Sequence, residues 1–92
     1  MAMLDTVKLA MRIANTAYDS EISSLIEAAC KDIGIVGVSV TSDTDDALLT
    51  RAIITYTRLN FGTPDDYDHL KASYDEQKAQ LITATGYGGA LT

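Results

Sequence analysis

Apolar residues recur at helical spacing most clearly between Asp19 and Ile33. They stand three and four positions apart, which predicts an amphipathic helix with one buried face. That face comprises Ile22, Leu25, Ile26, Ala29, Cys30 and Ile33. We expect Asp19 to be the N-cap, because its carboxylate can accept hydrogen bonds from the free amides of the first turn. Gly34 is expected to be the C-cap.

A shorter pattern predicts a preceding helix from Met3 to Ala14. Leu4, Val7 and Met11 follow helical spacing and so share one face. The pair Asn15-Thr16 then interrupts the pattern and predicts a break before the next helix.

A third helix is predicted from about Asp45 to Phe61. Its broad apolar face consists of Leu48, Leu49, Ala52, Ile53, Tyr56 and Leu59. The acidic residues at its start provide the cap and a favourable charge for the helix dipole; they are Asp43, Asp45 and Asp46. Gly62 should end this helix and Pro64 should prevent its continuation.

The last predicted helix runs from about Pro64 to Ala84, with Thr63 as its cap and Pro64 in its first position. Its face is narrower and more polar than the others, and consists of Tyr67, Leu70, Tyr74, Gln77, Lys78 and Leu81. Such a helix is expected at the edge of a bundle or against a partner.

The segment from Gly34 to Ser42 has a different character, because it is rich in β-branched residues and contains two glycines. We predict an extended, non-helical connection. A single short strand cannot form a sheet, so this segment packs on the helices, pairs with another segment, or contacts a neighbouring subunit. With two residues of the glycine-rich tail, it supplies the candidate interface: Ile35, Val36, Val38, Val40, Tyr87 and Leu91.

These patterns together predict an all-α fold, a small bundle of about four helices with an extended apolar connection between the second and third. We assign residues 1–84 to one helical domain and residues 85–92 to a flexible tail. A chain of 92 residues is too short for a second domain and has a modest core.

Composition narrows the possible functions. Thirteen acidic residues against seven basic ones give a net charge of -6, which argues against a dedicated nucleic-acid surface. No targeting signal is evident, and the longest apolar stretch is far shorter than the roughly 20 residues that span a bilayer. We therefore expect a soluble protein. Cys30 has no cysteine partner and lies on an apolar helical face, which favours a structural thiol.

Little in the chain indicates catalysis or cofactor binding. His69 is the only histidine and is expected on the surface. The cluster Asp43-Thr-Asp-Asp46 lacks the glycine and glutamate of a calcium loop, since Leu48 and Ile54 occupy those positions. No phosphate loop, metal set or catalytic triad can be assembled, so we expect a non-enzyme with no cofactor and no metal.

Two other classes stay open from the residues alone. The pair Asp19-Ser20 at a helix start is similar to the modification site of acyl carrier proteins, although Glu21 stands where carriers place an apolar residue. A small acidic regulatory protein that binds another protein is the second alternative.

Several stretches, taken in order, resemble the phage head-tail connector (DNA-packaging adaptor) family over about residues 3 to 83. They are Ala10-Met-Arg-Ile13, Asp19-Ser-Glu-Ile22, Ile22-Ser-Ser-Leu-Ile-Glu-Ala-Ala29, Leu48-Leu-Thr-Arg-Ala-Ile-Ile-Thr-Tyr56, Asn60-Phe-Gly62 and Tyr74-Asp-Glu-Gln-Lys78. The opening helix only loosely fits the family's leucine-arginine-isoleucine pattern, and the glycine-rich tail has no counterpart in the resemblance.

The resemblance implies structural work in a virion, at the head-tail junction, after assembly in the bacterial host cytoplasm. Such proteins form a ring of about twelve copies, joined by contacts between unlike faces. The ring docks on the portal protein, extends the DNA channel and receives a later head-completion or tail protein. DNA would pass through without sequence-specific binding, and no membrane is involved.

Overall fold

Four helices build the fold. The computed structural model describes residues 3–35, 40, 44, 46–62 and 64–83. The helices are α1 (Met3–Met11), α2 (Asp19–Ile35), α3 (Ala47–Asn60) and α4 (Tyr67–Thr83). The described residues contain no strand. The all-α prediction is therefore confirmed.

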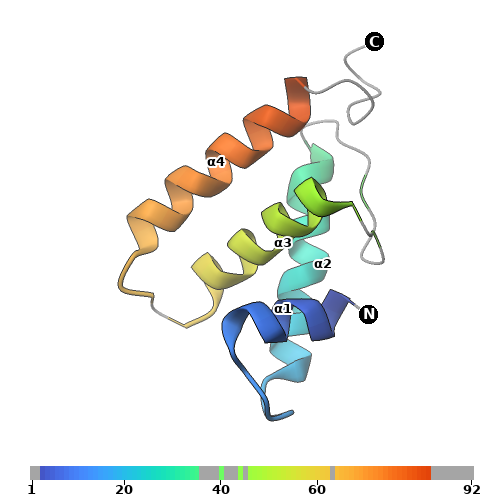
Figure 1. Ribbon diagram of the computed structural model, residues 1–92, viewed down its shortest axis with the longest axis vertical. Helices are drawn as coiled ribbons and strands as arrows, with labels where there is room; N and C mark the ends of the chain where they lie inside the picture. The colour runs from blue at the N-terminus through green and yellow to red at the C-terminus, as the bar shows by residue number, and fades with distance from the viewer. Residues whose placement is uncertain (1–2, 36–39, 41–43, 45, 63, 84–92) are drawn as a thin grey trace.

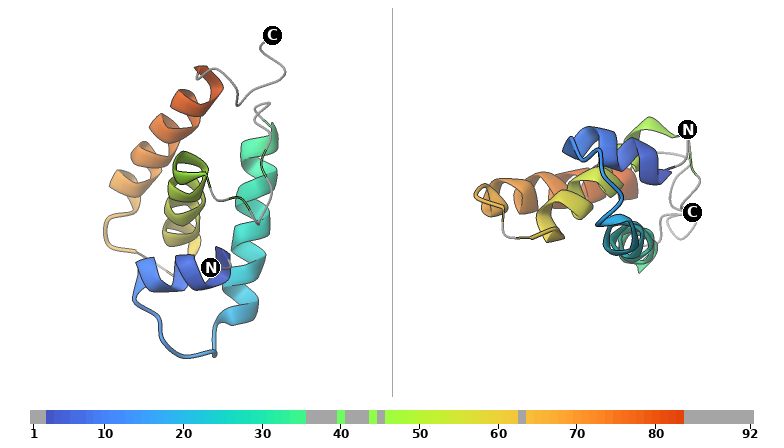
Figure 2. Two further views of the ribbon diagram at one scale, coloured as in Figure 1. Left: turned by 45° about the vertical axis from the view of Figure 1, so that its right-hand side comes forward. Right: turned by 90° about the horizontal axis from the view of Figure 1, so that it is seen from below.

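Helix α3 occupies the centre of the bundle. It packs against α4 on one side and α2 on the other, while α1 crosses α2 and α3 near one end (Figures 1 and 2). Its Ala52 and Ile53 are fully buried. Thr55 and Thr57 are also buried, and their hydroxyls donate to the carbonyls of Arg51 and Ile53 one turn earlier. Two polar residues are thus accommodated without an unpaired hydroxyl.

The core forms where the predicted faces of the helices meet. The apolar residues of α2 that are most enclosed follow the predicted spacing, and they are Ile22, Ile26, Ala29 and Ile33. Met3 and Val7 add the contribution of α1, whereas Leu70, Tyr74 and Leu81 add that of α4. Tyr67 was predicted on the α4 face, but it is the first residue of α4 and is 46% exposed.

The start of α3 follows the prediction closely. Asp46 is the N-cap, and its Oδ1 accepts from the amides of Leu48 at 2.9 Å and Leu49 at 3.1 Å. At the other end, Gly62 has φ +68°, a left-handed conformation that glycine adopts without steric cost. The predicted stop at Gly62 is confirmed.

Other predicted boundaries were wrong. Helix α1 ends at Met11, not Ala14, and α2 continues through Gly34 to Ile35. Gly34 is therefore helical, not a C-cap, and Ile35 does not belong to an extended arm. An exposed glycine with open space around it costs a helix only about 1 kcal/mol, which the flanking buried residues of α2 outweigh.

Two predicted helix starts also differ from the structure. Asp19 is the first residue of α2 and its carboxylate pairs with Lys8 of α1, so a tertiary partner replaces the local role. Helix α4 begins at Tyr67, three residues after Pro64, and the amide of Leu70 donates to the carbonyl of Asp66. The predicted cap Thr63 and the end at Ala84 lie outside the described residues.

Candidate assembly interface

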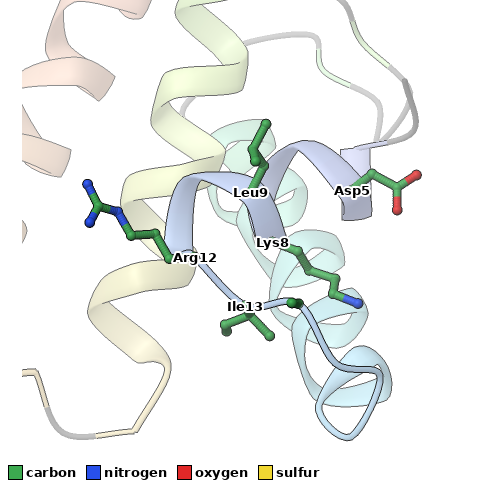
Figure 3. Close-up of a pocket in the computed structure, with 6 residues that line it drawn as sticks. Asp5, Lys8, Leu9, Arg12 and Ile13 are labelled. Atoms are coloured by element: carbon green, nitrogen blue, oxygen red, sulfur yellow. The ribbon is translucent and has the colours of Figure 1, made fainter.

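The outer face of α1 carries an apolar side chain in a charged setting. Leu9 is 70% exposed and lies in an open groove of about 540 Å³. The groove is lined by Asp5, Lys8, Leu9, Arg12, Ile13 and Ala14. In Figure 3 the side chains of Asp5 and Arg12 point in opposite directions from the two ends of α1, with Leu9 between them. This face can accept an apolar group flanked by charges of both signs.

The C-terminal end of α1 holds Arg12 in an uncommon backbone conformation. Its φ is +60°, which is left-handed and costs a residue other than glycine about 1 kcal/mol or more. The amide of Arg12 donates to the carbonyl of Leu9 at 3.1 Å, and that of Ile13 donates to Lys8 at 2.9 Å. These two bonds form a Schellman cap, in which glycine is the usual residue at this position.

Arg12 also lines a second open groove, which joins three parts of the fold. This groove has a volume of about 480 Å³ and is lined by Ala10, Met11, Arg12, Arg58, Pro64, Asp66 and Leu70. The ends of α1 and α3 thus bring two guanidinium groups to one depression, beside a single carboxylate. Such a groove suits a carboxylate ligand, because arginine binds carboxylates with two parallel hydrogen bonds.

Three of the four lysines form ion pairs in the described structure, whereas Lys31 and the three arginines do not. Lys8 pairs with Asp19 at 2.7 Å, Lys71 with Asp75 at 2.8 Å, and Lys78 with Asp32 at 3.2 Å. The Lys8–Asp19 contact is an ion pair that lacks hydrogen-bond alignment. Arg12, Arg51 and Arg58 are exposed, and within the described part of the chain none of them forms an ion pair.

A polar cluster connects α2 to α4 at the opposite end of the bundle. The Tyr74 hydroxyl donates to Asp32 Oδ2 at 2.6 Å, and Lys78 Nζ donates to the same oxygen at 3.2 Å. Lys78 Nζ also lies 4.8 Å from the centroid of the Tyr74 ring. Tyr56 packs edge-on against that ring, with centroids 5.3 Å apart.

These contacts change how the cluster titrates. Burial alone would raise the pKa of Asp32, but the hydrogen bonds from Tyr74 and Lys78 outweigh it and hold that pKa below its usual value of 3.8. Burial, followed by the hydrogen bond to Asp32, raises the pKa of Tyr74 well above its usual value of 10.0. Both residues therefore keep their ordinary charge at neutral pH, as expected of a structural connection between helices.

Comparison with known families decides the class of protein. A model of the family described as phage connector protein matches residues 3–88 of the chain. The chain belongs to the phage connector protein family. Its role is that of a structural connector in the phage particle, where it associates with other head or tail proteins. The match favours this class over the carrier and regulatory alternatives. No curated protein and no solved structure shows significant similarity to the chain.

Two of the six predicted interface residues of this connector lie within the described part of the chain. Ile35 is 82% exposed at the end of α2. Val40 is half-buried and packs against the core. At this position the structure agrees with the alternative in which the segment packs on the helices of its own monomer. Val36, Val38, Tyr87 and Leu91 lie outside the described residues. The candidate interface as a set therefore stays a prediction.

The residues considered for chemistry have simple surroundings in this connector. Cys30 is half-buried against the core, and burial, then the nearby Glu27, raises the pKa of its thiol, so the thiol is protonated at neutral pH. His69 and Ser20 are exposed. In the portion that the structure describes, no three His, Cys, Asp or Glu side chains gather as a metal site, and no described helix is long and apolar enough to cross a membrane.

Sequence reasoning missed the α1 groove. Leu9 is out of phase with the face formed by Leu4, Val7 and Met11, so it belonged to no predicted apolar face. That exclusion was itself a signal of an exposed leucine. The meeting of Arg12 and Arg58 had no sequence signal, because 46 positions separate them and only the packing of α1 across α3 brings them to one groove.

Proposed function

We propose that this connector docks as a ring on the portal of a filled capsid, extends the DNA channel, and receives a later head-completion or tail protein. It acts without catalysis. The observation that carries the proposal is the family match over residues 3–88. The family resemblance implies about twelve copies, and a heterologous contact repeated around the portal must close with the portal's symmetry.

Features of the chain support this structural role. The core is small, and large apolar side chains remain exposed on the described helices, namely Leu9, Ile35, Leu48 and Tyr67. A net charge of -6 also suits a channel lining, because like charge keeps DNA from adhering as it passes. A ring whose lumen is basic would contradict this part of the proposal.

The deciding experiment uses DNA-filled capsids that carry the portal but lack this protein. Purified chain is added, the capsids are sedimented, and the bound chain is counted per capsid. We expect binding to saturate at about twelve copies per capsid. Electron microscopy should show a ring of new density beneath the portal, and infectivity should recover when tails are supplied. Absence of binding to portal-bearing capsids would overturn the proposal.

A further inference from the structure

The two ends of α1 carry opposite charges that point away from each other. Asp5 lies in the first turn and Arg12 follows the last, and their side chains extend in opposite directions in Figure 3. Seven positions separate Asp5 from Arg12, which is about 10 Å along the helix axis. The monomer therefore presents a cationic edge and an anionic edge on different sides.

The cationic edge is the groove that holds Arg12 and Arg58. Its charged lining is two guanidiniums and the Asp66 carboxylate, which leaves one formal positive charge. Neither arginine has an ion-pair partner in the described structure, and Arg12 is held there at the expense of a left-handed backbone. The left-handed backbone belongs to the cap of α1, so the observation that indicates a missing anionic partner is the presence of two unpaired arginines in one groove.

The anionic edge lies where α1 begins beside α2. Glu27 is exposed and lines a small groove of about 160 Å³ with Met3, Leu4, Ser23 and Ile26. Asp5 follows Leu4 directly and is also exposed. Neither carboxylate forms an ion pair within the described residues. The two unpaired carboxylates thus lie on elements that meet where α1 begins, Asp5 on α1 and Glu27 on α2.

We propose that the Arg12–Arg58 groove of one copy receives Asp5 and Glu27 of the next copy. The inference rests on the proposed ring, and it names the contact between neighbouring subunits. Because the two edges differ, the contact is heterologous and propagates around a ring instead of ending at a pair. A second copy fits better than DNA, since Asp66 stands in the groove and the chain carries a net charge of -6.

The test compares two charge reversals on one helix. Arg58→Glu and Arg51→Glu both alter an exposed arginine of α3 and change the net charge equally, but only Arg58 lines the groove. Self-association is measured by sedimentation at low ionic strength over a wide range of concentration. We expect R58E to weaken it by about tenfold or more, and R51E to leave it near that of the natural chain.

Complementation then tests the direction of the contact. Glu27→Arg alone should weaken association, and an equimolar mixture of the R58E and E27R chains should restore it, because each glutamate then meets an arginine. Glu21→Arg, at another exposed position on α2, is the matched control and should leave association unchanged. Circular dichroism confirms that each variant folds.

Four results would overturn the inference: a natural chain that stays monomeric at low salt, equal effects of R58E and R51E, a mixture that fails to associate, or association that stops at two copies. Binding to portal-bearing capsids is measured separately. If any of these four results is obtained and the chain still binds the capsids, the contact is refuted and the proposed function stands.

Discussion

Two ends of the molecule contain basic residues near acidic ones. At one end α2 meets α4, and at the other α1 meets α3. The two ends differ in whether these charges are paired within the monomer. At the first, Lys78 and the Tyr74 hydroxyl converge on one oxygen of Asp32, so the donors and acceptor satisfy one another. At the second, Arg12 and Arg58 share a groove without an ion pair in the described structure.

The difference indicates which charges serve the fold and which are left for a partner. A satisfied cluster stabilises the monomer and offers little to a neighbour, since its charges are already compensated. Two arginines that share a groove with only one carboxylate contribute little to the monomer, but they gain when a further carboxylate arrives. Stability and assembly should therefore respond to mutations at different ends of this connector.

The largest expected effect lies in neither charged region but in the core that both share. Ile53→Ala removes a fully buried side chain from central α3 and should lower the free energy of unfolding by about 2–5 kcal/mol. Urea denaturation measures it. Leu9→Ala is the control, because Leu9 is 70% exposed, and a comparable loss there would show that α1 packs differently.

Tyr74→Phe tests the satisfied cluster. It removes the hydroxyl that donates to Asp32 at 2.6 Å and keeps the ring against Tyr56. We expect a loss of about 1–2 kcal/mol in the free energy of unfolding, with no change in self-association. Tyr18→Phe removes an exposed hydroxyl and serves as the comparison. Equal losses from both variants would mean that the Asp32 contact does not stabilise the fold.

Arg12→Gly tests the unsatisfied region and should change stability and assembly in opposite directions. Glycine adopts φ +60° freely, so the monomer should gain about 1 kcal/mol. The groove meanwhile loses one guanidinium, so association between copies should weaken. Denaturation and sedimentation of the same sample check both effects. A variant that loses stability would show that the Arg12 side chain supports the fold.

Lys8→Ala should have a smaller effect, a loss of about 0.5 kcal/mol. It breaks the 2.7 Å ion pair with Asp19 that joins α1 to α2, and the loss should shrink in concentrated salt because the pair is partly exposed. Lys71→Ala, on the more exposed pair within α4, should change stability less. A loss from Lys8→Ala that is independent of salt would indicate packing rather than charge.

The smallest expected effect is the dependence on pH of the stability that the Tyr74–Asp32 hydrogen bond contributes. The lowered pKa of Asp32 means that its contribution is present above pH 3.8 and is lost as pH falls through the folded-state pKa. The raised pKa of Tyr74 means that its contribution is present below pH 10.0 and is lost as pH rises above it. The stability difference between the natural chain and Y74F should thus be constant near neutrality and narrow at both extremes. A difference that is flat across the whole range would contradict the assigned bond.

The sequence by itself determined which four segments are helical and most of their buried faces, although Leu48 and Tyr67 from those faces are exposed. Helical spacing alone identified Ile22, Ile26, Ala29 and Ile33 as the buried face of α2, because burial of one face must repeat with the helical period. Local chemistry also placed the cap of α3 among Asp43, Asp45 and Asp46, of which Asp46 is the N-cap, and specified Gly62 as a stop, since such residues act on their own neighbouring backbone. The ordered segments further resembled the family that the chain proved to match.

Only the tertiary structure decided what depends on partners distant in the chain. Asp19 became an ion-pair partner because α1 places Lys8 beside it, and Gly34 stayed helical although glycine commonly ends helices. Tyr74 reached Asp32 across 42 positions, and Arg12 reached the groove of Arg58 across 46. Periodicity reports which face of a helix is buried, whereas the meeting of two charged side chains depends on how whole helices cross.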